Sequence, residues 1–402
     1  MEWQYIKRTI EPVLCDAVGH FPALALTGPR QSGKSTLLKH CFPEHTVISF
    51  DDPLNRARAV DDPRLLIAAN QGRLILDEMQ YVPELMSYIK MAIDDDRRNN
   101  GRFLLTGSQR FALMKNLSDS LAGRISIMEL LPFDAQEIEA STEKGTGEES
   151  FLRACLRGAY PEPALDPGMK RDAWYSAYLQ TYLERDISSI YNVGDLREFT
   201  RFLRLLAGRC GQQLNLSALA GDVGKSVNTI KRWVSVLEAG RIVFLLEPYY
   251  RNIGKRIVKS PKVYFIDCGL VCFLTGISDR EQLVNGPLAG PLFENYCIQE
   301  TVKLFVHKGK IPRLYFLRIT GGPEIDLLIE GPAGEMLPVE IKMTATPNMG
   351  MAASMEKALR EFHGVNAGAA RIVCLCREPV PLHRAITAVP VGNFLSELGA
   401  FD

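Results

Sequence analysis

The feature that most constrains this sequence is a glycine-rich loop placed between an apolar run and a helical one. Residues 23–27 read Ala-Leu-Ala-Leu-Thr and predict a short buried strand. The loop after them has the spacing Gly-x-x-x-x-Gly-Lys-Ser, and Leu37 begins the helical continuation. Such a loop turns its backbone N–H groups towards phosphates at a helix N-terminus. The sequence therefore predicts a nucleotide-phosphate site formed by Gly28, Pro29, Arg30, Gln31, Ser32, Gly33, Lys34, Ser35 and Thr36.

Individual residues of this loop have distinct expected roles. Gly28 and Gly33 have no Cβ and therefore permit tight turns. Lys34 is expected to reach the β- and γ-phosphates of ATP, and the Ser35 hydroxyl is expected to ligate Mg²⁺. The alternative, a glycine-rich turn with an unrelated lysine, does not account for the acidic strand end that follows.

A later apolar run ends in two carboxylates. Residues 73–78 read Arg-Leu-Ile-Leu-Asp-Glu. Because the carboxyl ends of parallel strands converge on the ligand crevice, Asp77 is expected beside the Mg²⁺ and Glu78 beside the attacking water. An acidic pair at a strand end can be incidental. Downstream of a phosphate loop, however, the pair favours the second half of an ATPase site.

The surrounding segments predict an α/β domain over residues 1–140. Strands that alternate with helices indicate a parallel sheet covered on both faces. The Asp-Glu strand is the third in sequence and Glu78 follows its Asp, which places the sheet in the additional-strand class of P-loop ATPases. In that class an extra strand lies beside the phosphate-loop strand. Further strands are expected at 46–50, 102–108 and 125–131, and helical segments at 54–70, 83–98 and 109–121.

Two further residues are candidates for the region around the γ-phosphate. Thr106, near the tip of the strand at 102–108, is expected to sense that phosphate or to orient the water. Arg124 is the favoured arginine contact, with Arg102 and Arg110 as rivals. Each of these arginines is also compatible with an ordinary surface position.

Residues 150–195 predict a helical connector, and residues 196–250 have the pattern of a winged helix-turn-helix. We expect Ser217 to cap a short helix at 218–222 and Ser226 to cap the longer helix that follows. A strand after the longer helix would form the wing.

The longer helix carries Asn228, Lys231 and Arg232 on its outer side, where a recognition helix meets a DNA groove. Many winged helices instead bind proteins or pack domains together, so both uses stay open. Basic residues after the wing favour DNA, although a solvated basic loop would have the same composition. These residues are Arg251, Lys255, Arg256 and Lys259.

Residues 257–402 predict a second α/β domain with a helix, three strands, a helix and a strand. Because strand side chains alternate, Glu340 and Lys342 share one face. Asp326 lies on the strand paired with theirs, and Glu294 lies on the preceding helix. This set is a candidate second metal site, in which Asp326 and Glu340 would hold Mg²⁺ near a phosphodiester.

The motifs occur in a defined order along the chain. The loop G-P-R-Q-S-G-K-S (Walker A) precedes F-D-D-P, the strand end L-D-E-M-Q (Walker B), L-T-G-S and L-A-G-R. In this order they resemble a prokaryotic AAA-type ATPase family whose members commonly carry a C-terminal domain of unknown function. The order Glu294, Asp326, Glu340-x-Lys342 resembles the PD-(D/E)xK nuclease fold. That resemblance implies a restriction-endonuclease-like domain, including its degenerate members that no longer cleave.

Composition limits the compartment and the partners. A chain of 402 residues is expected to form two to four domains. The 47 basic and 47 acidic residues exclude a global polyanion-binding charge, so any DNA surface must be local. The nine cysteines include no C-x-x-C pair, which fits a cytoplasmic protein, and no apolar run predicts a membrane span.

Together these features predict a Mg²⁺-dependent, ATP-binding ATPase that regulates how a winged helix and a nuclease-like domain engage duplex DNA. The alternative is a nucleotide-dependent protein-interaction switch with a catalytically inactive nuclease-like fold. An oligomer is compatible with either function, and nuclease activity stays open.

Overall fold

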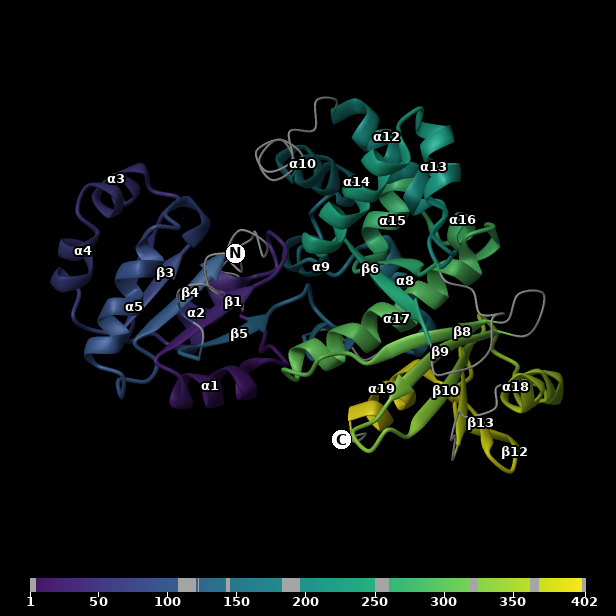
Figure 1. Cartoon of the computed structure of the whole chain (residues 1–402). Coiled ribbons are helices and arrows are strands. Elements are labelled where there is room, and N and C mark those ends of the chain that lie inside the picture. Colours follow the sequence, from purple (N-terminus) through teal and green to yellow (C-terminus); the bar gives the residue numbers. More distant parts are fainter. Residues whose placement is uncertain are drawn as a thin grey trace. The chain divides into compact units, whose positions relative to one another are not determined.

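A computed structural model describes residues 5–107, 121, 123–141, 145–182, 196–249, 260–318, 324–361 and 369–399 (Figure 1). The chain divides into two compact units, each with its own β-sheet. Unit 1 contains Met1–Phe133, Ala239–Arg241 and Phe305–Lys310. Unit 2 contains Asp134–Glu238, Ile242–Leu304 and Ile311–Asp402.

The described part of unit 1 is built on a five-stranded parallel sheet with the order β2-β3-β4-β1-β5. Strand β4 lies between the phosphate-loop strand β1 and the Asp-Glu strand β3, as the additional-strand arrangement requires. The predicted parallel α/β architecture of this region is therefore confirmed. The strands span Ala23–Thr27 (β1), Thr46–Ser49 (β2), Leu74–Asp77 (β3), Phe103–Gly107 (β4) and Ile125–Glu129 (β5).

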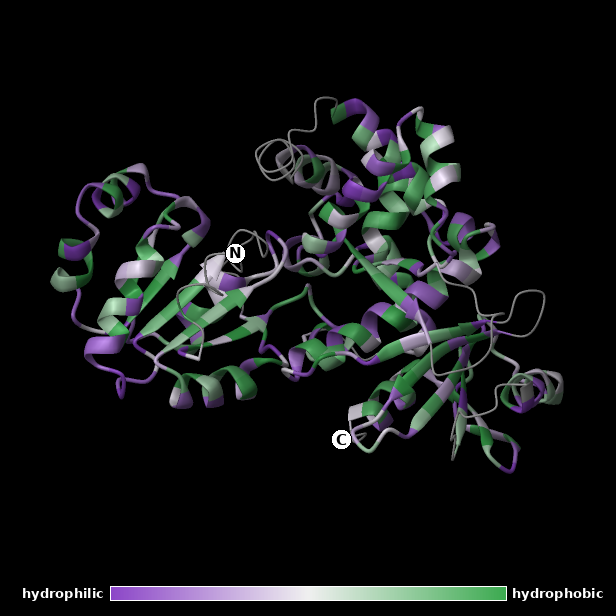
Figure 2. Cartoon of the chain, viewed as in Figure 1, coloured by the Kyte–Doolittle hydropathy of each residue, from purple (hydrophilic) through white to green (hydrophobic). Residues whose placement is uncertain are grey.

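Helices cover both faces of this sheet. Leu24 of β1 belongs to a core that includes Leu14 of α1 and Leu37 of α2. Its neighbour Ala25 belongs to a second core that includes Ile89 of α5, because successive strand residues point to opposite faces. Figure 2 shows the resulting hydrophobic character along β1 and β4. The helices span Glu11–His20 (α1), Lys34–Cys41 (α2), Pro53–Asp61 (α3), Pro63–Ala69 (α4), Met79–Tyr81 (η1, a 3₁₀ turn) and Leu85–Asp95 (α5).

The helical segment predicted at 54–70 is present as two helices, because α3 ends and α4 begins on either side of Asp62. Pro63 disfavours helical backbone at the residue before it, and Asp62 accordingly has φ −146° and ψ 81°. Its carboxylate then caps α4 by accepting a hydrogen bond from the Leu65 N–H at 2.8 Å. Residues 108–120, which include most of the predicted helix at 109–121 and Arg110, lie outside the described residues.

Unit 2 begins with short helices and continues with a three-helix group followed by an antiparallel hairpin, β6–β7. Asn215, and not Ser217, caps the first helix of the predicted helix-turn-helix. The Asn215 side chain accepts from the Ala218 N–H at 3.0 Å, and Ser217 lies inside the helix. Ser226 accepts from the Thr229 N–H at 3.1 Å, as expected of a cap. The elements are Ala135–Glu139 (α7), Gly147–Leu156 (α8), Pro161–Leu165 (α9), Arg171–Tyr182 (α10), Leu196–Ala207 (α12), Leu216–Val223 (α13), Val227–Ala239 (α14), Val243–Pro248 (β6) and Lys262–Phe265 (β7).

The hairpin joins a larger sheet. In the described residues, eight strands form the order β12-β13-β11-β10-β9-β8-β6-β7. The predicted order of a helix, three strands, a helix and a strand is present as α17, β8, β9, β10, α18 and β11. The pattern had not indicated β12, β13 or α19. The elements are Cys268–Thr275 (α15), Arg280–Asn285 (α16), Ala289–His307 (α17), Leu314–Arg318 (β8), Glu324–Glu330 (β9), Met336–Ile341 (β10), Met349–Glu361 (α18), Ala370–Cys374 (β11), Val380–His383 (β12), Ile386–Pro390 (β13) and Val391–Gly399 (α19).

Candidate functional site

The glycine-rich loop has a backbone that only certain residues tolerate. Gly28 has φ 141°, and a Cβ at this position would lie 2.1 Å from the main-chain oxygen of Leu130. Gly33 has φ 93° and forms the left-handed N-cap of α2. Both predicted turns therefore require glycine, for backbone conformation at both positions and for space at Gly28.

Lys34 extends back across the loop that precedes it. Its buried ammonium donates to the carbonyl oxygens of Gly28 at 3.0 Å and Pro29 at 2.8 Å. The lysine is thus held at the N-terminus of α2, where the helix dipole and the loop N–H groups also favour phosphate. These loop residues therefore fit the phosphates of a nucleoside triphosphate.

The acidic strand end meets the loop through hydrogen bonds. The Ser35 hydroxyl donates to Asp77 Oδ1 at 2.6 Å, and the Thr106 hydroxyl donates to the same oxygen. The Glu78 N–H in turn donates to Thr106 Oγ1 at 3.2 Å. Ser49 Oγ lies 3.5 Å from the other Asp77 oxygen. Mg²⁺ prefers oxygen ligands, and a hydroxyl and a carboxylate oxygen lie side by side here, so these residues fit that ion.

Glu78 follows Asp77 in a left-handed conformation with φ 61°. Its carboxylate accepts a hydrogen bond from the Gln80 amide. Burial raises the pKa of Glu78, and the nearby Asp77 charge adds to the rise, against the opposing effects of the Gln80 hydrogen bond and the Lys34 charge. A carboxylate with a raised pKa is a better proton acceptor than an exposed one, which suits a general base.

Arg8 is a supporting residue of this loop that the sequence pattern did not indicate. Its buried guanidinium donates to the carbonyl oxygens of Ser32 at 2.9 Å and Leu131 at 2.8 Å, and it lies over the ring of Phe133. It therefore ties the loop to the chain after β5. A single arginine in the N-terminal segment carries no motif that could have identified it.

Two of the three candidate arginines lie within the described residues, and both have partners outside the phosphate loop. Arg124 forms an ion pair with Asp94, with 2.6 Å between Nε and Oδ1. Arg102 donates to the carbonyl oxygen of Ala92 at 3.1 Å.

In unit 2, three of the predicted site residues meet across β9 and β10. Lys342 Nζ lies 2.6 Å from Glu340 Oε1 and 3.5 Å from Asp326 Oδ2. Asp326 also accepts from the Ile341 N–H at 2.9 Å. Burial, together with the Asp326 charge, raises the pKa of Glu340 to about 7, although Lys342 opposes the shift.

Glu294, the fourth predicted member, is bound by two residues that the sequence did not indicate. Tyr264 donates its hydroxyl to Glu294 Oε1, and Lys262 Nζ lies 3.0 Å from the same oxygen. Lys262 also lies 2.6 Å from Glu324 Oε1. An isolated lysine in a strand gives no sequence signal for such a role. The charged side chains line a cavity of about 550 Å³, together with Gly211, Gln212, Gln213 and Arg318.

The predicted DNA-contacting residues lie on α14. Asn228, Lys231 and Arg232 are exposed, whereas Ile230 and Trp233 are buried. The helix therefore presents these polar side chains on the side away from its core. Residues 250–259, with the four basic residues after the wing, lie outside the described residues.

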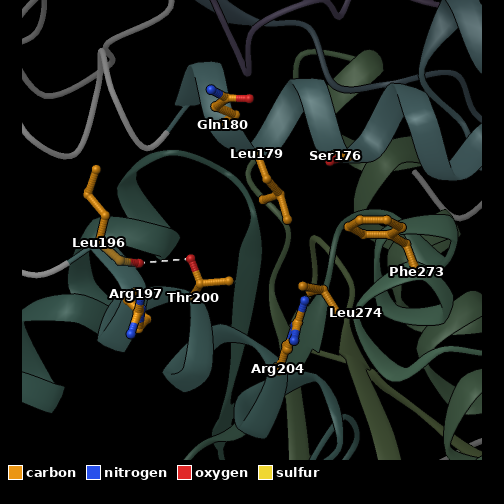
Figure 3. A pocket seen from close by; sticks show the side chains of 9 residues that line it. All are labelled: Ser176, Leu179, Gln180, Leu196, Arg197, Thr200, Arg204, Phe273 and Leu274. Atoms are coloured by element: carbon orange, nitrogen blue, oxygen red, sulfur yellow. Dashed lines mark hydrogen bonds between the residues drawn. The ribbon is translucent and has the colours of Figure 1, made fainter.

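A second cavity of unit 2, of about 320 Å³, is shown in Figure 3. Leu179 of α10, Phe273 of α15 and Arg204 of α12 line it, and Thr200 donates to the carbonyl oxygen of Leu196 at its edge. No carboxylate lines this cavity among the described residues. The described lining of this cavity therefore offers no carboxylate as a candidate general base or metal ligand.

The sheet order and the loop geometry define unit 1 as a P-loop ATPase fold. Residues 20–139 match the family model described as AAA domain, so this part of the chain is a nucleotide-binding AAA-type ATPase domain. Residues 148–281 and 289–394 match two models that are each described as a domain of unknown function, DUF8612 and DUF4143.

The chain belongs to the family of the uncharacterized protein Rv2008c of Mycobacterium tuberculosis. The two are 31% identical over 384 residues, which cover 94% of this chain and 82% of the relative. The uncharacterized protein MJ1544 of Methanocaldococcus jannaschii is 23% identical over 83% of this chain and 78% of its own. Among solved structures, the Walker-type ATPase PABY2304 of Pyrococcus abyssi is similar with a TM-score of 0.42 and 15% identity, over 66% of this chain and 94% of that one. None of the helices in the described residues is long and apolar enough to cross a membrane.

Proposed function

We propose that unit 1 hydrolyses ATP with Mg²⁺ held by Ser35 and Asp77. The observation that carries this proposal is the hydrogen-bonded series from Ser35 through Asp77 and Thr106 to the backbone of Glu78. It joins the phosphate loop to the candidate base across β1, β4 and β3. The ion would neutralise charge that develops on the phosphates.

Other side chains of unit 1 have separate proposed roles in binding and hydrolysing ATP. Lys34 is proposed to bind the β- and γ-phosphates, exchanging its two carbonyl partners for phosphate oxygens. Glu78 is proposed to take a proton from water, and Thr106 orients Asp77 beside it. Arg124 would contact the γ-phosphate only after leaving Asp94.

We further propose that nucleotide state regulates how unit 2 engages duplex DNA. The support is the exposed polar side of α14, which follows a helix and a turn and precedes a hairpin, as in a winged helix. Asn228, Lys231 and Arg232 are the proposed contacts. The proposed modules are the ATPase domain at 1–140, the connector at 150–195, the winged helix at 196–250 and a PD-(D/E)xK nuclease-like domain at 257–402.

The nuclease-like domain supports two functions. Asp326, Glu340 and Lys342 are grouped as phosphodiester chemistry would require, which favours action on the bound DNA. Lys262 and Glu324 add an ion pair inside the same cavity, which favours the second candidate, a protein-interaction switch on a catalytically inactive nuclease-like fold.

Binding of a fluorescent duplex to the full chain tests the DNA proposal. Fluorescence anisotropy would be measured over a range of salt concentrations, with and without Mg²⁺ and ATP. Replacing Lys231 and Arg232 with Ala should weaken binding and reduce the slope of log K against log salt by about two, because two phosphate contacts are lost.

A matched double variant, Lys357→Ala with Arg360→Ala, removes the same charge from exposed positions of α18 and should leave the slope unchanged. An equal change of this slope in both double variants would show that α14 does not contact the duplex. Binding of a protein but of no duplex would favour the switch.

A further inference from the structure

The carboxylate site of unit 2 already contains a cation. Lys262 Nζ lies 2.6 Å from Glu324 Oε1, 3.0 Å from Glu294 Oε1 and 3.9 Å from Asp326 Oδ1. These carboxylates come from β9 and α17, and the lysine comes from β7. The ammonium therefore lies among three acidic side chains from two other elements.

The position of Lys262 is fixed by its strand. Lys262 pairs with Leu246 in the β6–β7 hairpin and bridges to Gln213, and its ammonium lies 5.6 Å from the ring centre of Phe316. Its side chain is only 5% exposed, whereas that of Lys342, the other lysine of the site, is 43% exposed. Lys342 has room to turn towards solvent, but Lys262 must displace packed neighbours to leave.

A divalent ion bound by Glu294, Glu324 and Asp326 would compete with Lys262 for these carboxylates. Mg²⁺ binds oxygens at about 2.0–2.1 Å in near-octahedral geometry and keeps several waters. The Lys262 ammonium is within hydrogen-bond distance of Glu324 Oε1 and Glu294 Oε1, so it takes up lone pairs of these two carboxylates, and it lies 3.9 Å from Asp326 Oδ1. It also repels a second cation. Glu294, Glu324 and Asp326 therefore do not fit a bound metal while Lys262 stays in place.

We propose that Lys262 occupies the cation position of the carboxylate site, so that a divalent ion enters only when this lysine is displaced. The unit 2 site is then self-inhibited, and displacement of the Lys262 side chain would open it. This inference rests on the proposed function for the use of the site, but its test measures ion binding alone.

The test is a Mn²⁺ titration of the full chain by calorimetry, without nucleotide. All variants carry Asp77→Asn, which removes the proposed metal-binding carboxylate of unit 1. Lys262→Met should bind one Mn²⁺ at least tenfold more tightly than the chain with Lys262, and adding Asp326→Asn should abolish that binding. Lys262→Arg keeps the positive charge and should therefore show no increase in Mn²⁺ affinity. Lys342→Met is the matched control at the more exposed lysine. Its Mn²⁺ affinity should increase much less than that of Lys262→Met.

Thermal unfolding provides a second measurement, because an ion that binds only the folded state raises its stability. Mn²⁺ should raise the unfolding temperature of Lys262→Met but not that of the chain with Lys262. If Lys262→Met does not fold, Lys262→Met with Glu324→Gln removes one charge of each sign and takes its place. Equal Mn²⁺ binding with and without Lys262, or no binding by any folded variant, would overturn the proposal. Failure of the DNA measurements would leave this result unaffected.

Discussion

Gly28→Ala should disable the phosphate loop through its backbone. The new Cβ would lie 2.1 Å from Leu130 O, and the residue would keep φ 141°. Leu130 cannot simply move away, because its N–H donates to the Thr27 carbonyl oxygen at 2.8 Å. Backbone strain of this kind costs about 1–3 kcal/mol and an overpacked contact about 1–3 kcal/mol more. We therefore expect unit 1 to lose about 2–6 kcal/mol of its free energy of unfolding.

The measurement is denaturant unfolding by circular dichroism, with titration of a fluorescent ATP analogue. The transition of unit 1 is identified by its shift with MgATP. Gly123→Ala is the matched control, because Gly123 has φ 74° and no described atom lies within 4 Å of the new Cβ. It should cost only about 1–2 kcal/mol. If Gly28→Ala unfolds and binds the analogue as the unaltered chain does, the described route of the loop is wrong.

The remaining predictions concern Glu78 and His45. Glu78→Gln should keep ATP binding and lose hydrolysis by about 10²–10⁴-fold, because the amide cannot accept a proton; an unchanged turnover rate would assign the base elsewhere. Burial lowers the pKa of His45, whose Nε2 contacts the Gly101 carbonyl oxygen at 2.8 Å and whose Nδ1 has no partner among the described residues. The unfolded chain then binds more protons, so unit 1 should lose stability as pH falls through 6.5. His45→Gln should flatten that dependence in pH-resolved unfolding, and an unchanged profile would contradict it.

The candidate ATPase site could be proposed from the sequence because its residues lie in short local motifs. The loop residues are adjacent in sequence, and the rule that parallel strands end at one crevice brings Asp77 and Thr106 to the loop. The hydrogen bonds of Ser35 and Thr106 to Asp77 agree with that reasoning. The sequence did not indicate Arg8, because its partners are backbone carbonyl groups distant in the sequence. Every residue has such a group, so no pattern of side chains identifies these partners.

The limits elsewhere also have physical causes. Strand β12 has three of its four residues exposed, so it shows no alternation of apolar and polar side chains. Asp62-Pro63 did carry a readable signal for the break between α3 and α4, since a residue before proline avoids helical backbone. Lys262 reaches Glu294 and Glu324 only through the pairing of distant strands and a helix, so the sequence alone does not indicate that ion cluster.

Phosphate release from ATP by the full chain tests the central claim most directly. The unaltered chain should release phosphate with Mg²⁺ and stop when EDTA removes the ion. Lys34→Ala, which removes the charge at the phosphates, should abolish release while leaving the circular dichroism spectrum unchanged. Release that continues at the same rate in Lys34→Ala, or that does not depend on Mg²⁺, would contradict an ATPase site formed by Lys34, Ser35, Asp77 and Glu78.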